Sequence, residues 1–254
     1  MRSKFAVMGR IAFAAALTGT IALGVTGANA ATLSSITTAT GSAYGIKGSG
    51  IVTVAGTLAA VPVNIPETPT VTSTNSTTTQ NKTLASAYVP SLCAFLTPTC
   101  VVNTHVVKAT TRNANTGSTP GSTSSATAAD VSLLFDLVKA KAIHAECAAD
   151  KTGLTMSSGL VVLPSTTTVP VSAPLPIGSV PAANTVVPIG SGTTVVGTIT
   201  LNEQINTSTA TQNSGEVNAI HISLPAGSLL SATGVDVIVG HAACSATGTA
   251  ASSQ

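Results

Sequence analysis

The sequence is poor in charged and aromatic residues. Charged residues make up 7% of its 254 positions, against about 25% in an ordinary domain. Aromatic residues make up 2%, with no Trp, two Tyr and four Phe. Few rings argue against a sugar-binding site of the aromatic-platform kind, in which rings stack on sugar faces. A core must therefore be built from Val, Ile, Leu and Ala, while Ser and Thr hydroxyls supply the polar surface.

Familiar catalytic motifs are also missing. The sequence contains no Gly-x-Ser-x-Gly elbow, no His-Glu-x-x-His, no phosphate-binding loop and no Asp-rich calcium loop. Its eight Asp and Glu residues show no spacing typical of a paired-acid glycosidase. We therefore expect a protein that is not an enzyme and uses no cofactor. We assign no catalytic, cofactor-binding or metal-binding residue.

The first thirty residues are predicted to be a secretory signal peptide. Three basic residues precede an apolar run over 11–25, and Ala28-Asn29-Ala30 forms a small-x-small cleavage site. The run is shorter than the roughly 20 apolar residues that span a bilayer, and Thr-Gly-Thr interrupts it at 18–20. We expect cleavage after Ala30, secretion with no membrane insertion, and a single domain over 31–254.

The charge balance of the expected mature chain argues against two classes of partner. Without the first thirty residues, seven Lys and Arg remain against eight Asp and Glu, a net charge of 7 − 8 = −1. No Lys/Arg cluster remains that could bind the phosphates of nucleic acid or anionic lipid. We expect neither as a partner, and the sequence gives no indication of the oligomeric state.

Alternating Val, Ile and Thr predict the fold class. "GTTVVGTITLNEQ" and "EVNAIHISL" are typical of a hairpin with a polar tip, and "GVDVIVGHAACSA" of a last strand. We expect a mainly β protein, a single antiparallel β-sandwich-like domain with long Thr/Ser/Pro-rich loops. Two low-complexity stretches, at about 66–83 and 113–129, are the expected loops. Residues 130–149 fit a helix and a strand equally well, because alanine marks neither face.

Several segments, taken in order, resemble a known family. They are the signal peptide, "SAYGI", "DVSLL…LVKAKAIHAEC", "NTVVPIG…GTITLNEQ", "VNAIHISL" and "GVDVIVGHAACSA". Together they are similar to choice-of-anchor P proteins, secreted or surface proteins of high-GC Gram-positive bacteria. The resemblance implies a β-rich exported module tied to the cell envelope, without catalytic activity, and favours a strand for 130–149. No LPxTG-like sorting signal accompanies it, which favours secretion or noncovalent retention at the surface.

Four cysteines in an exported chain predict two disulfides. They are Cys93, Cys100, Cys147 and Cys244, and an even number in this compartment is typical of a disulfide framework. Three connectivities are possible. We favour Cys93 with Cys100, which closes a local loop, and Cys147 with Cys244, which joins distant strands.

The same cysteines raise a second possibility, because "HAEC" and "HAAC" repeat a His-x-x-Cys spacing. Two such pairs could supply four zinc ligands. On a strand, however, residues three apart point to opposite faces. With Cys147 on the face of Ile143 and Cys244 on that of Ile238, both histidines face away, so a disulfide is favoured over zinc.

The four histidines, at positions 105, 144, 221 and 241, are expected to face solvent from strands. One alternative is a metal or acid–base cluster of His221 with Glu203 and Glu216 near one hairpin. We expect a noncatalytic structural or adhesive protein that contacts other cell-envelope components. The alternatives are a surface- or polymer-binding module that uses Thr-rich strand faces, and a secreted hydrolase with an unrecognised site.

Overall fold

The computed structural model describes residues 31–54, 59–88, 102–133, 138–164, 176–191, 194–228 and 231–251. The predicted signal peptide and the predicted Cys93–Cys100 disulfide lie outside these ranges. In the described ranges the chain forms strands and turns, and it has no helix that could cross a membrane.

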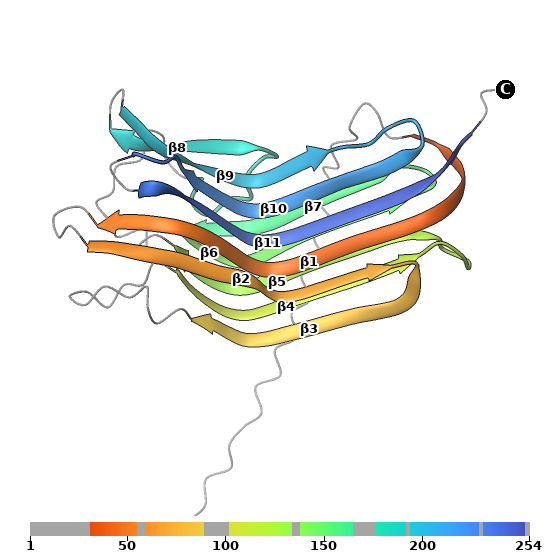
Figure 1. Cartoon of the computed structure of the whole chain (residues 1–254), viewed down its shortest axis with the longest axis horizontal. Coiled ribbons are helices and arrows are strands. Elements are labelled where there is room, and N and C mark those ends of the chain that lie inside the picture. Colours follow the sequence, from red (N-terminus) through yellow and green to blue (C-terminus); the bar gives the residue numbers. More distant parts are fainter. Residues whose placement is uncertain are drawn as a thin grey trace, which may run out of the picture.

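Two antiparallel sheets contain all the long strands of the described residues (Figure 1). The six-stranded sheet has the order β2-β1-β11-β10-β9-β8, and the five-stranded sheet has the order β3-β4-β5-β6-β7. The strands are β1 (Leu33–Val54), β2 (Ala59–Thr74), β3 (Ser76–Tyr88), β4 (Val102–Ala114), β5 (Gly121–Leu133), β6 (Val138–Asp150), β7 (Leu154–Leu163), β8 (Thr185–Ser191), β9 (Thr194–Asn206), β10 (Gln212–Leu224) and β11 (Ser231–Ala250).

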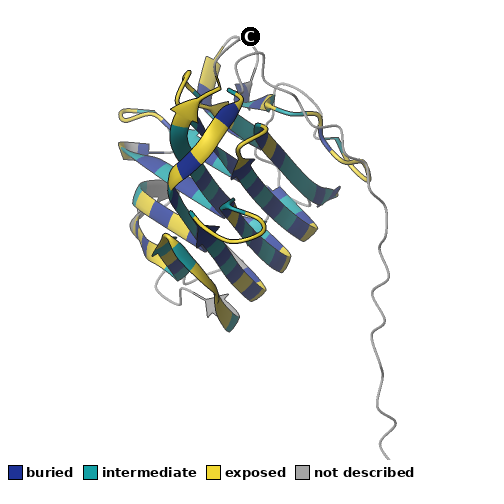
Figure 2. Ribbon diagram, turned by 90° about the vertical axis from the view of Figure 1, so that its right-hand side faces the viewer, coloured by how far each residue is buried: buried dark blue, intermediate teal, exposed yellow. Residues whose placement is uncertain are grey.

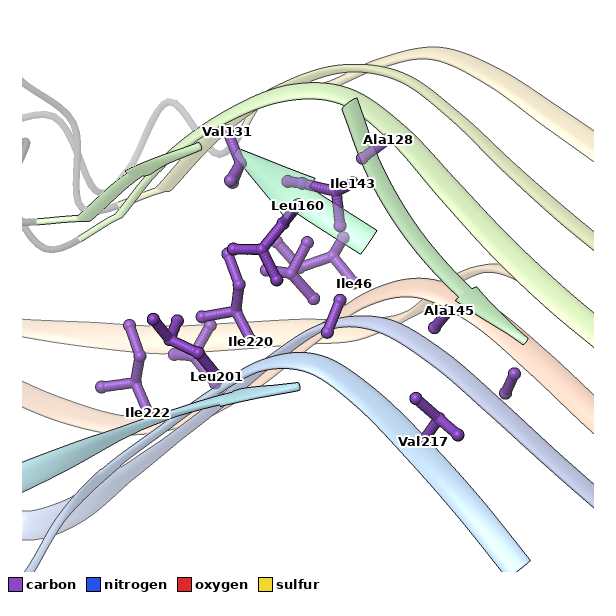
Figure 3. Close-up of a cluster of buried hydrophobic side chains, with 14 of the residues drawn as sticks. Ile46, Ala128, Val131, Ile143, Ala145, Leu160, Leu201, Val217, Ile220 and Ile222 are labelled. Carbon is purple, nitrogen blue, oxygen red and sulfur yellow. The ribbon is translucent and has the colours of Figure 1, made fainter. Parts of the chain in front are cut away.

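The core lies between the two sheets and is aliphatic, as the lack of rings requires. Ile46, Leu201 and Ile220 from the six-stranded sheet meet Ile143 and Leu160 from the five-stranded sheet (Figure 3). Buried and less buried residues alternate along the strands (Figure 2), which is the pattern of sheets that bury one face. The prediction of a mainly β, sandwich-like domain is confirmed.

The two stretches predicted to be long loops are largely strands instead. Residues 66–83 lie in β2 and β3, joined at Asn75, and residues 113–129 form the end of β4, a turn at 115–120 and most of β5. Thr favours strands because it is β-branched. In β5 the inward side chains up to Ala128 are small, Ser122 and Ser124 among them, so the sequence shows no hydrophobic alternation there.

Residues 130–149 form the end of β5 and most of β6, as the family resemblance favours, with 134–137 outside the described ranges. β6 pairs with β5 on one side and β7 on the other. The helical alternative is therefore wrong for the described part of this segment.

A row of irregular positions crosses both sheets. Tyr44 pairs with His241 and Ile46 with Val239, whereas Gly45 makes no ladder pair between them. Neighbouring strands are interrupted at the equivalent place, and Figure 1 shows the long strands bending near their midpoints. We call these positions the kink row: Pro69, Gly45, Gly240, Ala219 and Asn202 in the six-stranded sheet, and Val106, Ala129 and Ala142 in the five-stranded sheet.

The kink row inverts the faces of each strand that it crosses. In β11, Val237 and Val239 are buried before Gly240, and Ala242 and Cys244 are buried after it. Gly240 has a φ of 66°, which favours glycine. The prediction that Cys244 shares a face with Ile238 is therefore wrong, because Ile238 points outward before Gly240 and Cys244 points inward after it.

The same inversion affects β6. Ala142 has a φ of 52°, so Ile143 and Cys147 point inward after it, whereas Lys141 points outward before it. The regular alternation expected from the sequence holds only within each half of the strand.

Candidate functional site

The outer face of the six-stranded sheet carries a groove of about 610 Å³. It lies on the side of the kink row that contains the start of β1 and the end of β11. Its lining is mostly hydroxyl-bearing or small, and its hydroxyl groups include those of Thr40, Ser42, Thr72, Thr74, Ser214 and Ser245. A groove of this composition offers hydrogen-bond donors and acceptors rather than apolar contact.

Strand register arranges the lining in two rows. Thr74, Thr40, Ser245 and Ser214 stand opposite one another on β2, β1, β11 and β10. The second row runs through Thr72, Ser42, Ala243, Glu216 and Ile205. Adjacent strands lie about 4.8 Å apart, so each row presents closely spaced side chains across the groove.

Four of these hydroxyls are free to bind a ligand. Within the described residues, the side chains of Thr40, Ser42, Thr72 and Thr74 make no hydrogen bond. Each can both donate and accept. The β1–β2 wall of the groove therefore presents four unused hydroxyls.

A buried polar cluster supports that wall from below. Ser122 Oγ donates to the carbonyl of Thr40 over 2.7 Å, and Asn113 Nδ2 donates to the carbonyl of Ser73 over 3.1 Å. These bonds connect β4 and β5 to β1 and β2 across the two sheets. They hold the wall in place without using its outward hydroxyls.

A third row borders the groove at the kink row. Tyr44 on β1 stacks on His241 on β11, with ring centroids 4.3 Å apart and planes 13° apart. His241 Nδ1 lies 2.6 Å from Asn218 Oδ1, and Asn218 Nδ2 donates to Glu203 Oε2 over 2.7 Å. The row is therefore one connected chain of contacts across four strands.

His221 lies on the other side of the kink row and joins this chain. Its Nδ1 is 2.9 Å from Glu203 Oε2 and its Nε2 is 3.0 Å from Asp236 Oδ2. The hydrogen bond that His221 donates to Glu203 is the main reason that the pKa of His221 rises to about 9. The imidazole is therefore protonated at neutral pH and donates from both nitrogens. The same hydrogen bond lowers the pKa of Glu203, against the effect of burial.

His241 has the opposite electrostatic character. Burial lowers its pKa to about 4, because a low-dielectric environment disfavours the charged form. Since Asn218 donates its amide to Glu203, its Oδ1 is left to accept, which assigns the proton of neutral His241 to Nδ1. Burial also raises the pKa of Tyr44 above its usual range.

The structure partly assembles the predicted cluster of Glu203, Glu216 and His221. Glu203 and His221 are in contact, whereas Glu216 lies in the groove, on the strand next to Glu203 and one row away. His221 has no lone pair free to accept a proton, because both nitrogens donate to carboxylates. His221 on β10 therefore links Glu203 on β9 and Asp236 on β11 by ion pairs. It does not have the free nitrogen that a general base needs.

The other predicted site residues lie apart from the groove lining or serve the scaffold. Cys147 on β6 and Cys244 on β11 form a disulfide between the sheets, with Cα atoms 5.5 Å apart. His144 points outward and contacts Glu146, so the zinc alternative is not supported. No group of three potential metal ligands occurs among the described residues.

The expectation that the histidine rings face solvent holds for His105 but not for His241. His105 is exposed beside Asp130, as expected. His241 lies on the outer face but is only 8% exposed, because Tyr44 stacks on it. The sequence offered one hint of this contact, because Tyr44 in "SAYGI" is one of only two tyrosines in the chain.

We expect the two central histidines to give opposite pH dependences of stability. The folded-state pKa of His221 is raised from 6.5 to about 9, so its contribution is complete below pH 6.5 and is lost as the pH rises through 9. The folded-state pKa of His241 is lowered to about 4, so its contribution is present above pH 6.5 and is lost as the pH falls toward 4. Stability should therefore be highest near pH 6.5.

Urea unfolding from pH 4 to pH 10 of the wild type, His221→Gln and His241→Gln would measure this dependence. The difference between the wild type and His221→Gln should shrink from pH 6.5 to pH 9. The difference between the wild type and His241→Gln should shrink from pH 6.5 to pH 4. A difference that stays constant across its window would contradict the corresponding assignment.

The comparisons with family models, curated proteins and solved structures found no match to this chain. Fold and site together define a two-sheet β-domain with a hydroxyl-lined groove on one outer face. The residues of the groove are therefore the features of this chain that bear on its function.

Proposed function

We propose that this chain is a noncatalytic, secreted or envelope-associated adhesive domain of the choice-of-anchor P kind, and that it adheres by binding an envelope polysaccharide in the groove. The supporting observation is the groove itself, with two rows of side chains, four unused hydroxyls and one carboxyl group. Sugar hydroxyls pair with such groups by donating and accepting in turn.

The groove is prearranged for binding. Its strands belong to one continuous sheet, the Cys147–Cys244 disulfide fixes that sheet to the one behind it, and buried Ser122 and Asn113 hold β1 and β2. A site that is already ordered costs less entropy to occupy. Many weak polar contacts along a polymer can then add up to useful adhesion.

The alternative of a secreted hydrolase centred on Glu203, Glu216 and His221 has less support. His221 is occupied by two carboxylates, and Glu203 Oε2 accepts from both His221 and Asn218. The charged groups of this cluster are therefore paired with one another and stabilise the fold. Release of soluble fragments from a bound polysaccharide by the wild-type protein would contradict the noncatalytic proposal.

Thr72→Trp should weaken binding to purified envelope polysaccharide about tenfold or more, equivalent to at least roughly 1.4 kcal/mol. Thr72 is exposed on the groove wall, so an indole there occupies the space of the ligand. Affinity electrophoresis of the mature protein through gels containing the polysaccharide would measure the change.

Thr155→Trp is the matched control, because Thr155 is also an exposed threonine on an edge strand, in the five-stranded sheet. It should bind like the wild type. Equal retardation of both variants would show that the groove is not the contact surface. No retardation of the wild type would refute the adhesive proposal for that polymer.

A further inference from the structure

Among the described residues that line the groove, Glu216 has the one ionisable side chain. It lies on β10 in the middle of the sheet, opposite Ala243 on β11 and Ile205 on β9. Its neighbours across the strands therefore offer no charge and no side-chain donor. The carboxyl group is half-buried in a groove that otherwise presents hydroxyls.

Every other carboxylate on this part of the outer face has a partner. Glu203 accepts from His221 and Asn218, Asp236 contacts His221, and Glu67 is 3.3 Å from Lys47. Glu216 has no hydrogen bond or ion pair within the described residues. The one unpaired carboxylate described on this part of the face therefore lies in the groove.

The charges around Glu216 leave this part of the face negative. Glu203 on β9 lies one row along and repels it, while protonated His221 on β10 offsets part of that repulsion. His241 on β11 lies one row along on the opposite side of β10, and it is neutral. Tyr44 and Lys47 on β1, Glu67 on β2 and Asp236 on β11 lie on more distant strands or rows. Burial, then Glu203, raises the pKa of Glu216. A half-buried, unpaired carboxylate beside another one is a cost to the folded protein that a bound cation would relieve.

We propose that Glu216 selects a polysaccharide that carries free amino groups, with an ammonium of the sugar placed between Glu216 and Glu203. This inference depends on the proposed function and adds the class of ligand. A neutral sugar would satisfy the hydroxyls and leave the charge uncompensated, and an anionic polymer would be repelled. The described lining of the groove contains no lysine or arginine that would compete with a ligand cation.

Calorimetric titration with a glucosamine hexamer and an N-acetylglucosamine hexamer at pH 6.5 tests this selection. Both have the same backbone, and only the first carries ammonium groups. The wild type should bind the glucosamine hexamer about tenfold more tightly, in a salt-sensitive manner. Glu216→Gln should lose this preference by weakening the binding of the glucosamine hexamer, and should change the binding of the acetylated hexamer less than about twofold.

Glu146→Gln is the control, because Glu146 is a half-buried carboxylate on β6 of the five-stranded sheet, beside His144. It should leave both affinities unchanged. If both hexamers bind equally, or Glu216→Gln keeps the preference, the charge selection is wrong. If Thr72→Trp nevertheless weakens binding to envelope polysaccharide in affinity electrophoresis, the proposed adhesive function stands without the charge selection.

Discussion

Replacement of both Cys147 and Cys244 by alanine should lower the free energy of unfolding by about 4 to 5 kcal/mol. The disulfide joins β6 to β11 and closes a loop with a sequence separation of 97 residues. A cross-link restricts the unfolded chain, and in the chain-entropy model this effect grows with loop length. Because small domains are stable by only about 5 to 15 kcal/mol, the loss would be a large share of the total.

Urea unfolding in a background with Cys93→Ser and Cys100→Ser isolates this disulfide. Three samples are compared: the oxidised background protein, the same protein reduced, and the variant with alanine at both positions. The reduced protein keeps both buried sulfur atoms, so it separates the cross-link from the cavity that alanine leaves. Equal stability of the oxidised and reduced proteins would contradict the prediction.

Most strands could be predicted because alternation of apolar and polar residues is a local pattern. The long disulfide could be predicted because four cysteines allow few pairings. Ile220, Ile222 and Leu224 alternate with polar neighbours, and β10 buries all three. With four cysteines in the chain, only three pairings were possible. The strands of 66–83 and 113–129 were missed because their inward positions hold small or polar side chains, which look like loop composition.

The kink row could not be predicted from the sequence. Gly45 and Gly240 are possible signals of irregular strands. Val106 and Ala142 are not, since both adopt a positive φ that their residue types rarely favour. Neighbouring strands impose this conformation, because one irregular strand must be matched by the next. Side-chain faces derived by strict alternation are therefore correct only up to the kink.

The groove has no sequence signature for a related reason. Ser and Thr are abundant throughout the chain, and only strand register decides which of them share a face. The contact of Glu203 with His221 was foreseeable because a hairpin brings β9 beside β10. The unpaired state of Glu216 was not, because it depends on Ala243 in β11 and Ile205 in β9 being its neighbours.

The kink row also brings the two sheets close together at Gly45. A Cβ atom there would overlap Val107 Cγ1 of β4 and lie 3.0 Å from the carbonyl oxygen of Thr68. Val107 is fully buried, so it has little room to move. Only a residue without a side chain fits between β1 and β4 while Tyr44, the preceding residue, stacks on His241.

Gly45→Ala should therefore lower the free energy of unfolding by roughly 1 to 3 kcal/mol, because overpacking forces the sheets or their side chains apart. Gly159→Ala, in β7, is the matched control: its Cβ would meet nothing within 4 Å, and the change should stay below about 1 kcal/mol. In a Val107→Ala background, Gly45→Ala should cost at least about 1 kcal/mol less than in the wild type. Equal costs in the two backgrounds, measured by urea unfolding, would show that overlap with Val107 is not the source of the cost.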